Sequence, residues 1–397
     1  MLARHKAFFV SLFLTRLADQ ILLFLVPLVV FQITGSVSWS GLAFFAETLP
    51  RYVAFPIAGI LCDRHPPYRL LRLSQAMRAV VCIIGIAGEL SVGGVWWLIV
   101  LSALSGVLTT QGLMAREAIL PRVFATERFE KVASYTQLAD QLGTVLGPLI
   151  AASLMAVLPW QAVVVLAAGL FLLADLASAL WPARTDPSLT HMPKVSEPWI
   201  RSLATGLDRI ITLPGLMRPI LLAAAVNLII GVTLATSAAM VTGVQGLGEG
   251  AYALLQTGGA LATVAILLVT AHVGWPYQRM GVASYCLVAG GAYLTSFGEL
   301  PVVYTIGFLL VTGFDKMFNV YVRTLRKTLI PLEDFGKTTG LIVCFNNLSQ
   351  PLAGLLVTLY AVGEDASAVI FALTMVMVAT GAVLFAMPMV LGRRARS

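Results

Sequence analysis

The sequence predicts an all-α polytopic membrane protein with twelve transmembrane helices, built as two related bundles of six. Three observations lead to this prediction. The 397 residues are 58% hydrophobic and only 11% charged, whereas a soluble domain carries roughly 25% charged residues. The apolar stretches are long enough to cross a ~30 Å hydrocarbon core, which takes ~20 residues, and they do not alternate apolar with polar residues as barrel strands do. Short sequence patterns also recur between the two halves.

The predicted spans follow one another with short connections. They lie at 7–33, 40–61, 70–88, 95–120, 132–157, 160–182, 217–242, 250–272, 280–297, 301–322, 338–361 and 366–391. One connection is longer and polar, running from Pro182 to Leu216. We therefore predict an N-terminal six-helix bundle at 1–183, a cytoplasmic linker at 184–216 and a C-terminal six-helix bundle at 217–397.

Basic residues indicate the orientation of the chain. With the N-terminus in the cytoplasm, all but four of the 26 Lys and Arg residues fall in cytoplasmic connections or termini, and this assignment places Arg78 at the cytoplasmic foot of the third span. The other four (Arg16, Arg51, Arg116 and Lys316) lie within spans. Cytoplasmic loops carry this excess of Lys and Arg. We expect a multi-pass protein of the bacterial inner membrane with both termini in the cytoplasm.

Four short matches indicate an internal repeat. Their offsets lie between 206 and 210 residues, and they occur in the same order in both halves. The pairs are Pro67-Tyr68 with Pro276-Tyr277, Leu120-Pro121 with Ile330-Pro331, Phe129-Glu130-Lys131 with Phe335-Gly336-Lys337, and Asp140-Gln141-Leu142 with Asn346-Asn347-Leu348. Chance matching of short strings is the alternative. A duplicated six-helix unit is the interpretation that we follow.

The end of the second predicted span carries a recognisable loop motif. The stretch from Gly59 through Asp63 and Arg64 resembles the G-x-x-x-D-R loop of the major facilitator superfamily. The resemblance implies that Asp63 and Arg64, with Arg69 beyond them, hold the two halves together on the cytoplasmic side when the transporter faces outward. Pro66-Pro67 replaces the glycine and basic residues that are usual in the family.

The fifth predicted span contains closely spaced small residues. Gly143, Gly147 and Pro148 resemble the antiporter motif G-x-x-x-G-P of the same superfamily. Small residues four apart let two helices pack closely, and a proline inside a helix bends it. In the family this motif marks exporters, although ordinary small-residue packing is the alternative. The first two spans, the loop motif and residues 118–149 resemble most the branch of macrolide-efflux and enterobactin-type siderophore exporters.

The superfamily resemblance implies the major facilitator fold, in which two parallel repeats enclose a substrate site near the membrane midplane. Ionisable residues inside spans cost ~2.5–3.5 kcal/mol each and are functional candidates by default. The candidates for proton coupling are Asp140, Asp19, Glu117 and Glu47. Asp140 leads because it lies one turn from the glycine motif, and a salt bridge to Arg116 is its structural alternative.

The remaining polar residues within spans are expected to line a substrate cavity. They are Arg16, Arg51, Arg116, Gln141, Asn227, Asp315, Lys316, Asn319, Asn346 and Asn347. Arg16 with Asp19 and Glu47 with Arg51 could equally be structural pairs that fix helix register. Adjacent residues on a helix point ~100° apart, so we expect that Asp315 and Lys316 do not pair directly.

The mixed charges do not decide between an anionic siderophore and a cationic drug. No nucleophile–base set, nucleotide loop or metal motif is present, so an enzyme is not expected.

We expect a secondary-active exporter of a siderophore or drug-like amphiphile, without a cofactor and driven by a proton gradient. Its partners are a small-molecule substrate and the bilayer, not nucleic acid, and we expect a monomer. The alternatives are an importer, a lysophospholipid flippase, a metal exporter of the same fold, or a membrane receptor or assembly protein that transports nothing.

Overall fold

The computed structural model describes residues 2–34, 37–94, 96–124, 128–182, 189, 198–247, 249–360 and 366–386, and within these ranges the chain is helical and contains no strand. Twelve helices are long: α1 (Leu2–Thr34), α2 (Val37–Arg64), α3 (Pro67–Val92), α4 (Trp96–Val123), α5 (Phe129–Met155), α6 (Trp160–Ala179), α9 (Met217–Ala238), α10 (Glu249–His272), α11 (Tyr277–Thr295), α12 (Pro301–Leu329), α13 (Phe335–Tyr360) and α14 (Ser367–Ala386). The predicted all-α fold class is confirmed.

Nine of the described helices are long and apolar enough to cross a membrane. The other three long helices are α2, α11 and α13. Only part of α2 and of α13 has described side chains, and α11 begins with the polar residues Gln278 and Arg279. Several helices extend past their predicted spans because polar residues continue them beyond the apolar part. For example, α12 reaches Leu329, whereas its span was predicted to end at residue 322.

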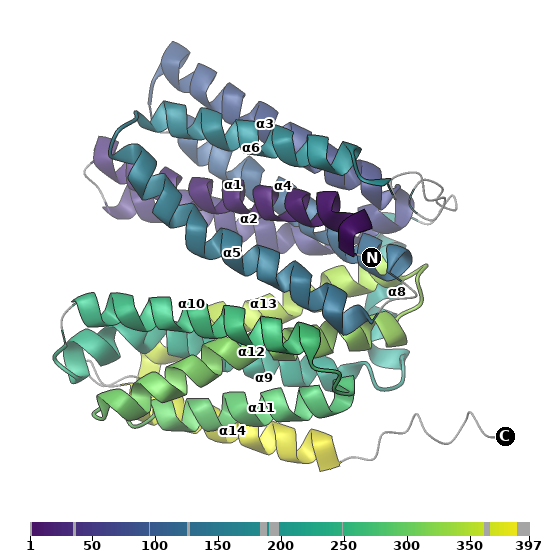
Figure 1. The fold of residues 1–397 in the computed structure, drawn as a ribbon, viewed down its shortest axis with the longest axis vertical. Coiled ribbons are helices and arrows are strands. Elements are labelled where there is room, and N and C mark those ends of the chain that lie inside the picture. The colour runs from purple at the N-terminus through teal and green to yellow at the C-terminus, as the bar shows by residue number, and fades with distance from the viewer. Residues whose placement is uncertain are drawn as a thin grey trace. The chain divides into compact units, whose positions relative to one another are not determined.

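The chain divides into two compact units. Unit 1 contains residues 1–127, 138–206 and 332–341, and unit 2 contains 128–137, 207–331 and 342–397. Two helices, α5 and α13, therefore have their first residues in one unit and the rest in the other. In each unit the long helices lie side by side, as Figure 1 shows for α1, α3 and α6 of unit 1 and for α11, α12 and α14 of unit 2.

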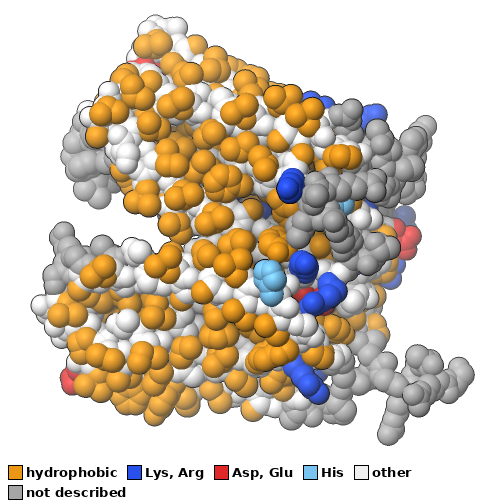
Figure 2. Space-filling model, viewed as in Figure 1, with side chains coloured by type: hydrophobic (Ala, Val, Ile, Leu, Met, Phe, Trp, Pro, Cys, Tyr) orange, Lys and Arg blue, Asp and Glu red, His pale blue; other side chains and the backbone are white. Residues whose placement is uncertain are grey.

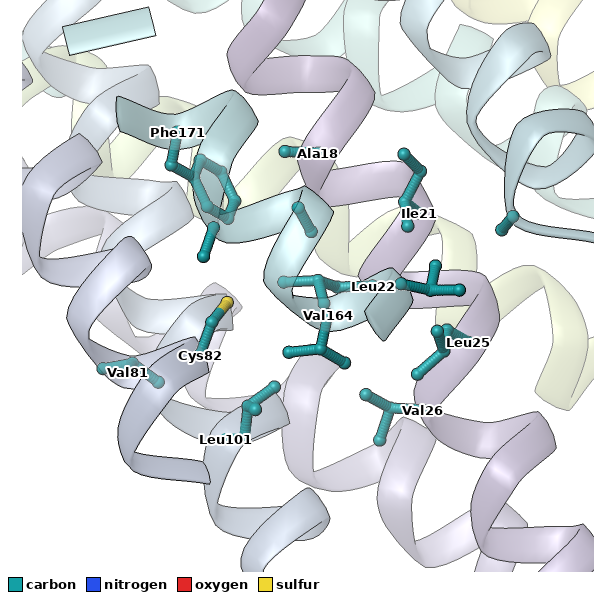
Figure 3. Packing of buried hydrophobic residues seen from close by; sticks show 14 of the residues in the cluster. Ala18, Ile21, Leu22, Leu25, Val26, Val81, Cys82, Leu101, Val164 and Phe171 are labelled. Carbon is teal, nitrogen blue, oxygen red and sulfur yellow. The ribbon is translucent and has the colours of Figure 1, made fainter. Parts of the chain in front are cut away.

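The core of unit 1 lies where α1, α3, α4 and α6 meet. Ile21 and Leu25 of α1, Val164 and Phe171 of α6 and Cys82 of α3 belong to one cluster of buried side chains (Figure 3). All five side chains are at most 1% exposed. Interhelical packing of this kind, rather than the hydrophobic effect, holds helices together in lipid.

Unit 2 packs partly through glycines. The Cβ of any residue replacing Gly291 of α11 would lie 2.8 Å from the carbonyl oxygen of Gly307 on α12, so the two backbones are in direct contact there. The Tyr285 hydroxyl of α11 donates a hydrogen bond to the Met377 carbonyl of α14 at 2.7 Å. These contacts fix α11 against both neighbours.

The predicted linker contains a helix that the sequence reading did not anticipate, α8 (Trp199–Thr212).

Hydrophobic side chains cover most of the helical surface seen in Figure 2, and Lys and Arg side chains gather at one end of the helices. This separation of basic from apolar surface is what a membrane protein requires.

Candidate functional site

The first charged pair of unit 1 joins α1 to α3. Arg78 Nη1 donates to Asp19 Oδ1 at 2.7 Å, and the Thr109 hydroxyl of α4 donates to the same oxygen at 3.0 Å. The guanidinium also lies over the ring of Phe171, 4.6 Å from its centroid. Arg78 is 0% and Asp19 6% exposed. The expectation that Arg78 lies at the foot of its helix was wrong, because α3 runs from Pro67 to Val92 and places Arg78 near its middle, where the side chain is buried among four helices.

The second pair joins α4 to α5. Arg116 Nη1 lies 2.7 and 2.8 Å from the two carboxylate oxygens of Asp140. Glu117 is next to the same guanidinium, with its Oε1 at 3.7 Å from Nη2. The Asp140 side chain remains 19% exposed, against 6% for that of Arg116. Of the two interpretations for Asp140, the structure shows the ion pair, and its partly exposed carboxylate stays accessible.

The glycine motif of α5 lies directly against α1. A side chain at Gly143 would place its Cβ 2.7 Å from Cγ of Arg16, and one at Gly147 would collide with Cβ of Gln20. Arg16 Nε makes a long hydrogen bond of 3.4 Å to the Thr144 hydroxyl. Both glycines are therefore required for close contact, and α5 continues as a helix through Pro148.

These groups border a small cavity of about 20 Å³ within unit 1. Its walls include Arg16, Asp19, Arg78, Arg116 and Asp140. A cavity of this size has room for about one water molecule. Both ion pairs thus contribute to the lining of one shared cavity instead of lying in separate parts of the bundle.

The other candidates of the first half lie near this site or outside the described side chains. Arg51 is half-buried on α2, and its carbonyl accepts a hydrogen bond from the Thr110 hydroxyl at 3.0 Å. Gln141 is half-buried on α5. The side chain of Glu47 lies outside the part of the chain that is described.

In unit 2 the expected separation of Asp315 and Lys316 was wrong. Lys316 Nζ lies 2.6 Å from Asp315 Oδ2, and Asn319 Nδ2 donates to Asp315 Oδ1 at 2.9 Å. The long lysine side chain bends back along the helix, so the ~100° between the two positions does not keep the charges apart.

The asparagines of the second half divide by burial. Asn227 and Asn347 are half-buried, whereas Asn346 is 8% exposed. Within the described residues the Asn346 Oδ1 atom is buried and has no hydrogen-bond partner. Buried polar atoms are normally paired, so this oxygen is one of the exceptions among the described residues. In the internal repeat Asn346 corresponds to Asp140.

The loop motif binds the first turn of α13. Asp63 accepts hydrogen bonds from the backbone N–H groups of Gly336 and Lys337, both at 2.7 Å. Gly59 lies so close to Gly336 and Gly340 that a side chain at any of the three would collide with backbone. Asp63 lies beyond the predicted span 40–61, and burial raises its pKa to about 7 against the opposing effect of the two hydrogen bonds.

The other members of the motif act elsewhere. Arg64 donates to the Ser202 hydroxyl of α8 at 2.9 Å, and its guanidinium lies 4.6 Å from the ring centroid of Trp199. Arg69 is exposed on α3. Sequence reasoning missed Arg78 and the partners Gly336 and Gly340. Arg78 could have been found from the spacing of Ser74 and Arg78, because residues at i and i+4 lie on one face of a helix.

Comparisons with known proteins agree with this architecture. The family model described as Major Facilitator Superfamily matches residues 8–354, so the chain belongs to that superfamily. An uncharacterised MFS-type transporter, YfiS of Bacillus subtilis (strain 168), is 22% identical over 339 residues, which are 83% of this chain and 80% of that protein.

Two solved structures share the fold. A bacterial homologue of the iron transporter ferroportin, solved in an outward-facing state, aligns with a TM-score of 0.77 at 16% identity and covers 96% of this chain and 98% of its own. The human organic anion transporter MFSD10 (TETRAN) aligns with a TM-score of 0.68 at 14% identity, with the same coverage. At these identities the likeness shows the fold alone.

Proposed function

We propose that this member of the major facilitator superfamily is a secondary-active exporter of a siderophore or drug-like amphiphile, coupled to proton movement through Asp140. The observation that carries the proposal is the Arg116–Asp140 ion pair, which is partly exposed and lies one turn from the glycine contact between α5 and α1. The antiporter-like motif and the resemblance to exporters support the direction of transport.

The ion pair provides a way for a proton to change the structure. Protonating Asp140 removes its negative charge, so two charge-assisted hydrogen bonds between α4 and α5 weaken, while Arg116 keeps Glu117 beside it. Charge-assisted bonds are roughly twice as strong as neutral ones. Because α5 packs on α1 one turn away, loosening α5 from α4 changes the surface that the cargo meets. A proton and a cargo that favour different arrangements of α5 would bind alternately, as antiport requires.

Transport by reconstituted protein tests the proposal. In proteoliposomes that carry a fluorescent amphiphilic drug or a ferric siderophore, wild-type transport should accelerate under a proton gradient. In Asp140→Asn the increase in transport rate caused by the gradient should be at least ten-fold smaller than in wild type, while cargo binding is retained. Asp175→Asn is the matched control, because Asp175 forms an equally short two-bond pair with Arg72 elsewhere in the same unit. If Asp140→Asn responds to the gradient as wild type does, Asp140 does not carry the proton.

A second candidate, a lysophospholipid flippase, is favoured by a groove in unit 2. A cavity of about 610 Å³ lies between α9, α13 and α14, and its lining is apolar apart from Ser349 and Thr380. Such a groove suits an acyl chain that enters from the bilayer. Uptake of a fluorescent lysolipid that is lost in Ala225→Trp, by a protein that transports no drug, would support this candidate over drug export.

A further inference from the structure

A second cavity of unit 2 lies at the turn between α10 and α11. Its volume is about 230 Å³, and its walls are formed by α10, α11, α12 and the turn, with side chains that include Val273, Trp275, Met280, Ala283 and Phe314. The hydroxyl in the lining, that of Thr270, already donates to the Ile266 carbonyl at 2.7 Å. The interior therefore offers contacts to hydrocarbon. Drug-sized sites usually exceed 300 Å³, so the cavity suits a chain better than a bulky molecule.

A guanidinium is fixed on the turn beside this cavity. Arg128 Nη2 donates to the carbonyl of Val273, a lining residue, at 3.1 Å. Its Nη1 lies 3.8 Å from the position that a Cβ on Gly274 would occupy, so the arginine lies along the turn. A guanidinium has five N–H donors, and Arg128 is exposed. It can therefore hold the carbonyl and an anion together.

The residues around this cavity indicate that it lies near the membrane surface. Trp275 is 52% exposed in the wall of the cavity, and it lies three residues beyond the end of a span at His272. Tryptophan is enriched where the hydrocarbon meets the headgroups. Residues 266–287 contain no Asp or Glu, and Arg279 adds a second positive charge after the turn. An apolar cavity, an exposed tryptophan and an arginine thus lie together at this turn, where they match the acyl chain and the phosphate of an anionic lipid.

We propose that this cavity binds an anionic phospholipid of the cytoplasmic leaflet, with one acyl chain in the cavity and the phosphate on Arg128. The proposal goes beyond the transport function and does not depend on the cargo. Arg128 immediately precedes α5, whose later residues carry Asp140 and the glycine motif. The start of α5 is also held by Tyr135 edge-on to His272 and by Lys327 over Phe129. A bound lipid adds to these contacts and steadies the start of the helix that the proposed transport cycle uses.

Native mass spectrometry of the purified protein tests the site with phosphatidylglycerol and phosphatidylcholine as probes. Wild type should retain one phosphatidylglycerol and prefer it by about five-fold, the factor expected for one arginine at a membrane surface. Arg128→Gln should lose the preference, and Arg128→Lys should keep it. Ala283→Phe, which fills the cavity without changing charge, should reduce binding of both lipids. Lys6→Gln removes an exposed positive charge from unit 1 and should behave as wild type.

Each other outcome decides against the site. Equal retention by wild type, Arg128→Gln and Ala283→Phe would overturn the proposal outright. Loss in Arg128→Gln with full binding in Ala283→Phe would show that the headgroup binds without the cavity. Loss in Ala283→Phe alone would show an apolar ligand with no need for negative charge. Lipid retention is measured without cargo and without a proton gradient, so its outcome is independent of the transport test of Asp140.

Discussion

At the scale of single residues, the interior of unit 1 holds its charges in pairs that connect different helices. Asp19 is bound by Arg78 and Thr109, and Asp140 by Arg116. Removing one partner of a buried pair leaves an uncompensated charge and costs about 3–5 kcal/mol. The pairs therefore fix the helices against one another, whatever else they do in the transport cycle.

This argument predicts a large effect at Arg78. Arg78→Met should lower the free energy of unfolding by about 3–5 kcal/mol, visible as a lower midpoint in thermal unfolding of the detergent-solubilised protein. Asp19→Asn combined with Arg78→Met should recover part of the loss, because the unpaired charge is then gone. Arg69→Met removes an exposed arginine of the same helix and should change stability by no more than about 0.5 kcal/mol. A single Arg78→Met variant with a wild-type midpoint would contradict the prediction.

Single residues are also where the sequence was least informative. The depth of Asp140 and Arg116 in the membrane could be estimated by counting residues along their helices. The structure shows that the two side chains form an ion pair. The partner of Asp19 could not be predicted, because helix periodicity gives the face of a residue on its own helix but not the neighbouring helix that it meets. Lys316 shows a second limit, since its flexible side chain reaches Asp315 despite their different directions.

At the scale of helices, close packing depends on a few glycines. Gly143 and Gly147 bring α5 against α1, and Gly59 brings α2 against the start of α13. The small-residue spacing in α5 was visible in the sequence. The spacing of Gly336 and Gly340 is the same, but nothing in the sequence identified α2 as their partner.

Gly147→Leu tests the role of the α1–α5 contact. Its side chain would meet Gln20 of α1, so the helices must separate. Overpacking costs about 1–3 kcal/mol, and we expect the protein to fold with a lower unfolding midpoint and transport at least ten-fold slower. Gly169→Leu is the matched control, because no atom lies within 4 Å of its Cβ position on α6. Equal transport by the two variants would show that close α1–α5 packing is not needed.

Hydropathy was sufficient to place the long helices, because a span must be apolar over ~20 residues. The predicted 250–272 corresponds to α10 (Glu249–His272) and 280–297 to α11 (Tyr277–Thr295). Hydropathy did not reveal α8, because its apolar residues are interleaved with polar ones. Ile200 and Ile211 of α8 are 83% and 74% exposed, whereas Ser202 is 2% exposed.

At the scale of the whole chain, the internal repeat and the division into units are related. Residues 128–137 of α5 belong to unit 2, and residues 332–341, which include the start of α13, belong to unit 1. These segments contain the repeat pair Phe129-Glu130-Lys131 and Phe335-Gly336-Lys337. Hydrogen bonds hold each segment in place. In the first, Arg128 donates to the Val273 carbonyl, and in the second the N–H groups of Gly336 and Lys337 donate to Asp63.

The Asp63 contact should respond to pH. Its carboxyl has a pKa raised to about 7 in the contact, against 3.8 in water, because it is buried. A raised pKa means that the contact binds the proton more tightly than the open state does, so protonation stabilises it. This stabilisation is fully present below about pH 4, decreases as pH rises to about 7, and does not change further above that value. The first turn of α13 should therefore open more readily at pH 7 than at pH 5.

Cysteine labelling can measure this opening. Thr338 is 0% exposed beside the contact, whereas Leu332 is 51% exposed. The labelling rate of Thr338→Cys, divided by that of Leu332→Cys to cancel the pH dependence of thiol reactivity, should rise several-fold from pH 5 to pH 7 and then level off. Asp63→Asn cannot titrate, so its ratio should be constant over the same range. A wild-type ratio that is flat, or a rise that persists in Asp63→Asn, would show that another group controls the α2–α13 contact.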